Sequence, residues 1–337
     1  GLIPAWINGL QGRRFMRWGT GSQRFSRPIR WLLALKGVDL IPVEIPGADP
    51  PVRSGRFSRG HRLHGDQPLP IDTADAYDDT LAAAGVIVDR KQRAALIRSQ
   101  LDASADQLNG LPDCPESLFE ELVDLVESPR LLQGSIAERF LSLPPEVIIT
   151  VMQAHQRYVP LKVPEVTPDP LQLEATGVLQ RAFLLVGNGL EAADALITRG
   201  NERVLAARLA DAEFFLSVDR RQPSSARREA LDRVTFAEGL GSLLDRCQRI
   251  ERTARQLVDQ LNLDAHQGEA AIRAAHFCKH DLVSQMVGEF PELQGLMGGK
   301  YLLEEGEPTE VALAVVEHYL PYSTTTIQPN SSGDRLC

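Results

Sequence analysis

Cysteine is scarce in this chain of 337 residues, and its spacing excludes two kinds of structure that cysteines commonly build. The four cysteines, Cys114, Cys247, Cys278 and Cys337, are far apart and include no CxxC pair. Zinc fingers need such pairs, and small disulfide-stapled domains need cysteines at a much higher density. We therefore interpret the cysteines as reduced thiols of a cytoplasmic protein, with Cys278 in a core.

Long apolar runs and a secretory leader are also missing. No run approaches the roughly 20 apolar residues that a membrane-spanning helix requires. The N-terminal GLIPAWINGLQGRRF lacks the charged, apolar, small-residue order of a signal peptide. We predict a cytoplasmic protein without a membrane partner. Because the sequence does not begin with methionine, we also expect a piece of a longer protein.

Several nucleotide-binding and catalytic motifs are absent as well. There is no GxxxxGK[ST] phosphate loop and no GxSxG nucleophile motif, and GTGSQRF (19–25) has its glycines in the wrong order for a dinucleotide fingerprint. The glycines of MGGK (297–300) are expected to cap a helix or form a turn. We therefore assign no catalytic residue to this chain.

The order of expected elements predicts an α+β fold. A chain of this length should form two or three domains. Residues 1–190 mix short strands with helices, with a possible sub-boundary near 110–117, and almost everything from 191 onward has helical periodicity. We predict a mixed α/β portion over 1–190, a helical connector over 191–235, an all-α domain over 236–321 and a disordered tail over 322–337.

Individual elements follow from periodicity and from turn residues. Residues 28–45 predict two β segments, or a short helix and a strand, and the Gly-, Pro- and Arg-rich stretch 46–72 predicts a loop. Strands are expected at 86–89, 157–163 and 181–188, and helices over 74–84, 90–108, 146–156, 200–219, 240–261, 269–287 and 308–319.

Positive charge is concentrated near the N-terminus, although the whole chain has a net charge of −9. Between residues 13 and 64 there are eleven Arg and Lys residues against three acidic ones. RFSRPIRW (24–31) and GRFSRGHRLHG (55–65) mix Arg with aromatic or His side chains, and HQRYVPL (155–161) is a shorter example. Guanidinium groups neutralise phosphates, and aromatic rings stack on unpaired bases. The first two stretches favour RNA binding, with a solvated basic face as the alternative; a packed role is equally open for the third.

A His-Asp doublet, His280-Asp281, raises the question of a metal site. Metal phosphohydrolases hold a divalent ion with such a pair, together with a His on an earlier helix and an Asp on a later one. The helix expected over 240–261 contains no histidine, and His276 lies one helical turn before His280. Two ligands one turn apart make a weak site, so we predict no metal. In the structural alternative, Asp281 accepts hydrogen bonds or pairs with a basic neighbour such as Lys279.

Eight motifs, taken in order, resemble the β subunit of the bacterial heterotetrameric glycyl-tRNA synthetase. The resemblance covers nearly the whole chain, from about residue 12 to 321, and the motifs are MRWG (16–19), FSRPIRWLLAL (25–35), SRGHRLHG (58–65), MQAHQRYVPL (152–161), GNERVLAARLADAEFFLSVD (200–219), FAEGLGSLLDRCQRIERTA (236–254), CKHDLVSQMVGEFPELQGLMGGKY (278–301) and VEHYLP (316–321). After the last motif we recognise no family motif in the C-terminal STTTIQPNSSGDRLC and expect it to match nothing in the family, so the resemblance indicates a chain truncated at both ends.

The resemblance implies a subunit of a glycine–tRNA ligase, an aminoacyl-tRNA synthetase that uses ATP to attach glycine through a glycyl-adenylate. Two α subunits would carry the catalytic core with ATP and Mg, and two β subunits would bind tRNA(Gly). No cofactor is expected in this chain, and the fragment alone is not expected to be active. The domain over 236–321 would be an HD-like helical domain, in which His280 and Asp281 are a relic of a lost metal site.

A tRNA-binding role nominates ten candidate residues. The basic ones would contact phosphates, and the aromatic and histidine side chains would stack or donate hydrogen bonds. They are Arg24, Arg27, Arg30, Arg59, His61, Arg62, His64, Arg157, Tyr158 and Lys279. Two alternatives remain open, an active HD-type metal-dependent phosphohydrolase and a non-catalytic scaffold for the α subunit.

Overall fold

The computed structural model describes residues 2–12, 14–45, 47–48, 50–65 and 67–320, without the side chain of His64. Its internal contacts divide the chain into two units that are interleaved in the sequence. The first unit comprises Gly1–Asp102, Phe119–Leu132 and Val186–Ala195. The second comprises Ala103–Leu118, Gln133–Leu185 and Leu196–Cys337. The predicted bounds at 190, 235 and 321 stay predictions, and the tail expected to be disordered lies outside the described residues.

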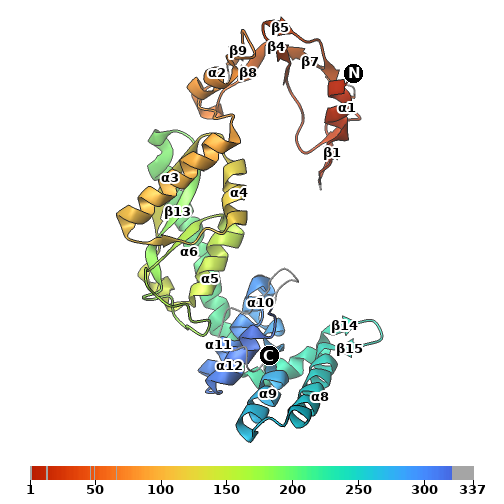
Figure 1. Cartoon of the computed structure of the whole chain (residues 1–337), viewed down its shortest axis with the longest axis vertical. Coiled ribbons are helices and arrows are strands. Elements are labelled where there is room, and N and C mark those ends of the chain that lie inside the picture. Colours follow the sequence, from red (N-terminus) through yellow and green to blue (C-terminus); the bar gives the residue numbers. More distant parts are fainter. Residues whose placement is uncertain (1, 13, 46, 49, 66, 321–337) are drawn as a thin grey trace. The chain divides into compact units, whose positions relative to one another are not determined.

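Short β pairings dominate the N-terminal part of the first unit (Figure 1). After the helix α1 (Leu2–Gly9) come two-residue strands β1 (Met16–Arg17), β2 (Arg24–Phe25), β3 (Leu32–Leu33), β4 (Leu35–Lys36), β5 (Asp39–Leu40) and β6 (Glu44–Ile45), followed by β7 (Val52–Gly55), β8 (Phe57–Arg59) and β9 (Pro68–Pro70). The strand order β3-β7-β6 forms one small sheet, and β1-β2, β4-β5 and β8-β9 form antiparallel pairs. The buried residues Ile7, Ile45 and Val52 form the hydrophobic core of this N-terminal part.

The loop prediction for 46–72 is wrong where β7, β8 and β9 form. These strands are three or four residues long, too short for alternation to be visible among the prolines and glycines. They form because their backbone groups find partners at short range, such as the Phe57↔Pro70 pairing of β8 with β9. The prediction of β segments over 28–45 is confirmed by strands β3 to β6.

Two helices of the first unit confirm the helices predicted at 74–84 and 90–108, and a third was not predicted. They are α2 (Tyr77–Ala83), α3 (Arg90–Leu108) and α4 (Glu116–Leu125), of which the last two cross into the second unit. The strand predicted at 86–89 is not formed. Arg93 donates to the carbonyls of Ile87 and Val88 at 2.8 and 2.9 Å, so a side chain takes the place of a neighbouring strand.

A four-stranded sheet has the order β10-β12-β13-β11. Its strands are β10 (Leu111–Pro112), β11 (Pro129–Ser135), β12 (Val159–Lys162) and β13 (Leu179–Asn188). β12 and β13 are antiparallel and confirm the strands predicted at 157–163 and 181–188. Pro145 begins the helix α5 (Pro145–Thr150), which continues as a π-helical turn over Val151–Gln156 and confirms the predicted helix at 146–156.

The rest of the second unit is mainly helical, with one hairpin (Figure 1). Its elements are α6 (Asp194–Asp219), α7 (Ser224–Ala230), β14 (Thr235–Ala237), β15 (Gly241–Ser242), α8 (Leu243–Leu261), α9 (Ala265–Phe277), α10 (Gln285–Glu289), α11 (Leu296–Glu304) and α12 (Thr309–Glu317). Helices α8 and α9 pack together, as do α11 and α12. The chain as a whole is therefore mixed α and β, and the β14-β15 hairpin corrects the expectation of an all-α domain.

Two predictions about the helices are wrong. The helix expected over 269–287 ends at Phe277, and His280–Val283 forms a 3-10 turn before α10, so His276 and His280 do not share a helix. The MGGK motif lies inside α11 and is no cap. A β-carbon at Gly299 would lie 2.5 Å from the carbonyl oxygen of Ala312, so glycine is used here for close helix packing.

Candidate nucleic-acid interface

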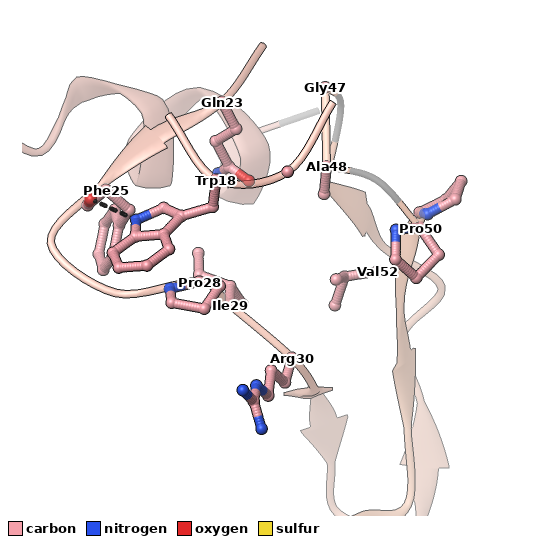
Figure 2. Close-up of a pocket in the computed structure, with 12 residues that line it drawn as sticks. Trp18, Gln23, Phe25, Pro28, Ile29, Arg30, Gly47, Ala48, Pro50 and Val52 are labelled. Carbon is pink, nitrogen blue, oxygen red and sulfur yellow. Dashed lines mark hydrogen bonds between the residues drawn. The ribbon is translucent and has the colours of Figure 1, made fainter. Parts of the chain in front are cut away.

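An aromatic pocket of about 480 Å³ lies in the N-terminal part of the first unit. Figure 2 shows Trp18, Phe25 and Pro28 on one side of it, with Pro50 and Val52 on the other. The indole Nε1 of Trp18 donates to the carbonyl oxygen of Phe25 at 3.0 Å, which fixes the plane of the ring. The pocket therefore offers a rigid aromatic wall to a ligand.

A hairpin and one carbonyl group create this pocket. The pairing of Met16 with Phe25 closes the β1-β2 hairpin, whose turn contains Trp18 and Gln23. The backbone N–H groups of Ser22 and Gln23 donate to the carbonyl oxygen of Gly47 at 2.9 and 3.1 Å. Gly47 has a φ of +80°, which favours glycine. These bonds bring residues 47–48 to the pocket, although residues 47–48 follow Gln23 by more than twenty positions in the sequence.

Three of the predicted arginines are placed at or next to the pocket. Arg30 lines it, and Arg24 and Arg27 lie on β2 and shortly after it. All three are exposed, and among the residues that the structure describes their guanidinium groups form no ion pair. Arg27 donates to the carbonyl oxygen of Ser26 at 3.0 Å. Such groups are available to a polyanion because no carboxylate already holds them.

A cation–π contact joins the second predicted motif to the first. The guanidinium of Arg59 lies over the Trp31 ring, 5.4 Å from its centroid, and thereby joins GRFSRGHRLHG to RFSRPIRW. Arg62 is exposed, whereas the side chain of His64 lies outside the described residues. The ring of His61 is buried, with Nε2 3.1 Å from Oδ1 of Asn188 and Nδ1 accepting from the backbone of Leu63. The observed role of the His61 ring is to fix the loop that contains it.

The third predicted stretch has a packed role. Tyr158 is buried, stacks on Phe183 with ring centroids 4.9 Å apart, and donates its hydroxyl to Oδ1 of Asn201. Burial raises the pKa of the Tyr158 phenol. Arg157 has a φ of +59° and donates to the carbonyl groups of the preceding helical turn. Of the two roles left open for this stretch, the structure shows packing, and RNA contact by either residue stays a prediction.

Lys279 is also covered by protein. Its Nζ lies 3.5 Å from the centroid of the Tyr319 ring, and burial lowers the pKa of the ammonium group. The contact is a cation–π interaction inside the second unit. A phosphate contact at Lys279 stays a prediction, and it would require the side chain to leave this ring.

The His280-Asp281 doublet is fully buried and has its own hydrogen-bond partners. Arg227 donates from Nε to Nδ1 of His280 at 3.3 Å, and Nε2 lies 3.1 Å from the carbonyl oxygen of Gly298. Asp281 Oδ2 accepts from the backbone N–H groups of Gly295 and Gly298 at 2.6 and 3.0 Å. Both ring nitrogens are therefore engaged, and the carboxylate holds the first turn of α11.

Burial shifts the pKa values of the doublet in opposite directions. Desolvation, followed by the charge of Arg227, lowers the pKa of His280 to about 3. Desolvation raises the pKa of Asp281 to about 6, and its backbone hydrogen bonds limit this rise. Within the described part of the chain, no three His, Cys, Asp or Glu side chains are arranged so that they could hold a metal ion.

A second cavity, of about 590 Å³, lies between α8, α9 and α12. Its lining contains four glutamates, and several of the charges around it are paired. Glu251 accepts from Nδ1 of His276 at 2.9 Å and lies 3.3 Å from Arg228, and Glu307 pairs with Arg273. This cavity is unsuitable for a polyanion, because its carboxylates would repel phosphates. As for membranes, none of the helices in the described ranges is both long and apolar enough to cross one.

Sequence reasoning missed Trp18 and Gln23, which line the aromatic pocket. A signal for Trp18 was present, because MRWG lies directly before the basic-aromatic stretch that begins at Arg24. No local signal marks Gln23, whose position depends on the hydrogen bonds to Gly47.

Comparison with known proteins gives one family. The family model described as glycyl-tRNA synthetase beta subunit matches residues 1–334. The match includes most of the C-terminal stretch STTTIQPNSSGDRLC, so the expectation that this stretch matches nothing in the family is wrong. The glycine–tRNA ligase beta subunit of Gloeothece citriformis is 43% identical over 330 residues, which are 98% of this chain and 45% of that protein. Those of Acaryochloris marina and Moorella thermoacetica are 44% and 41% identical, over 95% and 99% of this chain and 44% and 45% of their own length. This chain thus spans less than half the length of these relatives.

Proposed function

The chain belongs to the glycyl-tRNA synthetase β-subunit family, and on this premise we propose that it binds tRNA(Gly) and positions it for a separate catalytic α subunit. In this proposal two α and two β subunits form a cytoplasmic glycine–tRNA ligase, and ATP and Mg are bound by the α subunits. The β chain contributes no catalytic group of its own. It holds the RNA in place, and such positioning can account for several kcal/mol of a reaction barrier.

The observation that carries the proposal is the group of exposed arginines at the aromatic pocket. Arg24, Arg27 and Arg30 lie within seven residues of one another and form no ion pair with any described carboxylate. Guanidinium groups that are not held by carboxylates can pair with phosphates, and this pairing releases the counterions that surround the nucleic acid. Aromatic rings beside them add a surface for unpaired bases.

Within this proposal, the helices from α8 to α12 form an HD-like domain in which the His280-Asp281 doublet has a structural role. His280 and Asp281 engage Arg227 and the first turn of α11, so the pair supports the fold of the second unit. No observation favours a phosphohydrolase over this reading. A scaffold that contacts only the α subunit is the remaining alternative, and RNA binding by the isolated chain distinguishes the two.

The test is filter binding of tRNA(Gly) to the chain with Arg24, Arg27 and Arg30 changed together to alanine. We expect weaker binding and a slope of log Kd against log salt that is smaller by about 2 to 3, because roughly one counterion is released per phosphate contact. A control variant removes the same charge from exposed arginines elsewhere: Arg199, Arg203 and Arg233. Equal affinity and equal slope for wild type and the first variant would contradict the proposal.

A further inference from the structure

The aromatic pocket has features that phosphate binding does not need. Apolar side chains lie on both sides of the cavity, Trp18 and Phe25 on one side and Pro50 and Val52 on the other (Figure 2). A phosphate gains nothing from such walls because it is strongly hydrated. A flat, apolar ring of low charge would gain from both of them.

The pocket also has polar groups. The Gln23 side chain lies at the wall, and its Nε2 is shielded from solvent with no hydrogen-bond partner among the described residues. Buried amide groups normally have partners, and no described protein group serves as one for this nitrogen. Rotation of the amide exchanges nitrogen and oxygen, so Gln23 can present a donor or an acceptor to a ligand. Arg30 also lines the pocket.

We propose that this pocket takes one unpaired nucleobase of the bound RNA. The base lies against the Trp18 ring, its edge meets the amide of Gln23, and the phosphate that follows meets Arg30. A volume of about 480 Å³ leaves room for a purine or a pyrimidine. The proposal rests on the function proposed above for its class of ligand, and it adds a site that recognises a base.

The experiment follows the fluorescence of Trp18 alone. The chain contains three tryptophans, and changing Trp6 and Trp31 to phenylalanine in the full chain leaves Trp18 as the only emitter. The probes are a single-stranded oligoribonucleotide, an abasic oligoribonucleotide of the same length, and tRNA(Gly). We expect saturable quenching by the first and the third probe and none by the abasic chain, because only a stacked base quenches the indole.

Three variants test the indole of Trp18 and the amide of Gln23 separately. Trp18→Ala should weaken binding of the oligoribonucleotide by roughly 10- to 100-fold, whereas Trp18→Phe should restore most of it, because stacking is tolerant of ring type. Gln23→Leu keeps the volume but loses the amide. It should leave the affinity for mixed sequences nearly unchanged and reduce the difference between homopolymers of A, C, G and U.

The outcomes separate this proposal from the function on which it rests. If tRNA binds with its salt dependence, but Trp18 is quenched equally by the abasic chain and Trp18→Ala binds like wild type, the base pocket is wrong and the proposed function stands. If the oligoribonucleotide quenches Trp18 but tRNA(Gly) does not bind, the proposed function fails and the pocket stands. Quenching by a proline-rich peptide, with no response to any RNA, would assign the pocket to a protein partner and overturn both.

Discussion

At the scale of single residues, burial separates the candidate arginines from the other candidates. Arg24, Arg27, Arg30 and Arg62 are exposed, whereas His61, Tyr158 and Lys279 are buried and already have partners inside the protein. A ring that is stacked on Phe183 or bonded to Asn188 cannot also stack on a base without a local rearrangement. The exposed arginines are therefore the better candidates for contact with RNA.

Asp281 gives a prediction at this scale. Its Oδ2 accepts two backbone hydrogen bonds in a fully buried place, so Asp281→Ala leaves the N–H groups of Gly295 and Gly298 unsatisfied. We expect a loss of about 3 kcal/mol in the free energy of unfolding of the second unit. Urea denaturation followed by circular dichroism measures this loss.

The matched control is Asp281→Asn, which keeps one carbonyl oxygen in place of Oδ2. It should retain more than half of the stability that Asp281→Ala loses. If both variants unfold at the wild-type urea concentration, the carboxylate has no structural role, and the assignment of the doublet to the fold is wrong.

At the scale of elements, packing decides the role of the glycines in α11. Intrinsic helix propensity predicts that Gly→Ala stabilises a helix by about 1 kcal/mol. At Gly299 the new methyl group would lie 2.5 Å from both the Ala312 carbonyl oxygen and Cγ2 of Val316. We therefore expect Gly299→Ala to lower the free energy of unfolding by about 1 to 3 kcal/mol, since overpacking a core costs that much.

Gly288 in α10 is the control for this prediction. A β-carbon there would meet nothing within 4 Å, so Gly288→Ala should be neutral or stabilising. Thermal unfolding followed at a helix-sensitive wavelength compares the two variants. The same sign of change for both would mean that propensity, not the contact between α11 and α12, governs these positions.

At the scale of the whole molecule, the two units should unfold as separate transitions seen by different probes. All three tryptophans belong to the first unit, so indole fluorescence reports on it, whereas most of the helices from α6 to α12 belong to the second. A single free energy of unfolding is not defined for such a chain. Circular dichroism is the probe to use for the second unit.

The second unit should lose stability in mild acid. Burial lowers the pKa of His280 to about 3 and that of His318 to about 4, below the ordinary value of 6.5. The unfolded chain therefore binds protons first, and stability present above pH 6.5 is lost as the pH falls through that value toward 4. Each histidine should cost about 2 kcal/mol at pH 5. Asp281, with its pKa raised to about 6, has the opposite effect and offsets about 1 kcal/mol of this.

Urea titrations at pH 7 and pH 5, followed by circular dichroism, measure the difference. The groups around these histidines include Arg227, which contacts His280, and Lys279 and Arg246, whose charges act on His318. The double variant His280→Gln/His318→Gln should show a much smaller drop between the two pH values. An equal drop in the variant and in the wild type would assign the acid sensitivity to other groups.

The sequence by itself determined many of the regular elements and the family. The helix at 90–108 has the predicted bounds, the strands at 157–163 and 181–188 are present, and eight ordered motifs indicated the family that the comparisons confirm. These features can be predicted from the sequence because periodicity reflects local backbone geometry. The ordered motifs can be recognised without knowledge of which distant segments are in contact.

Only the tertiary structure decided which polar side chains are buried and where the pocket forms. His61 is buried because Asn188, 127 positions away, reaches its ring, and Gln23 lines the pocket because its backbone donates to Gly47. The glycines of MGGK are inside a helix because α12 packs against them. In each case the deciding partner is distant in sequence, so no local pattern contains the information.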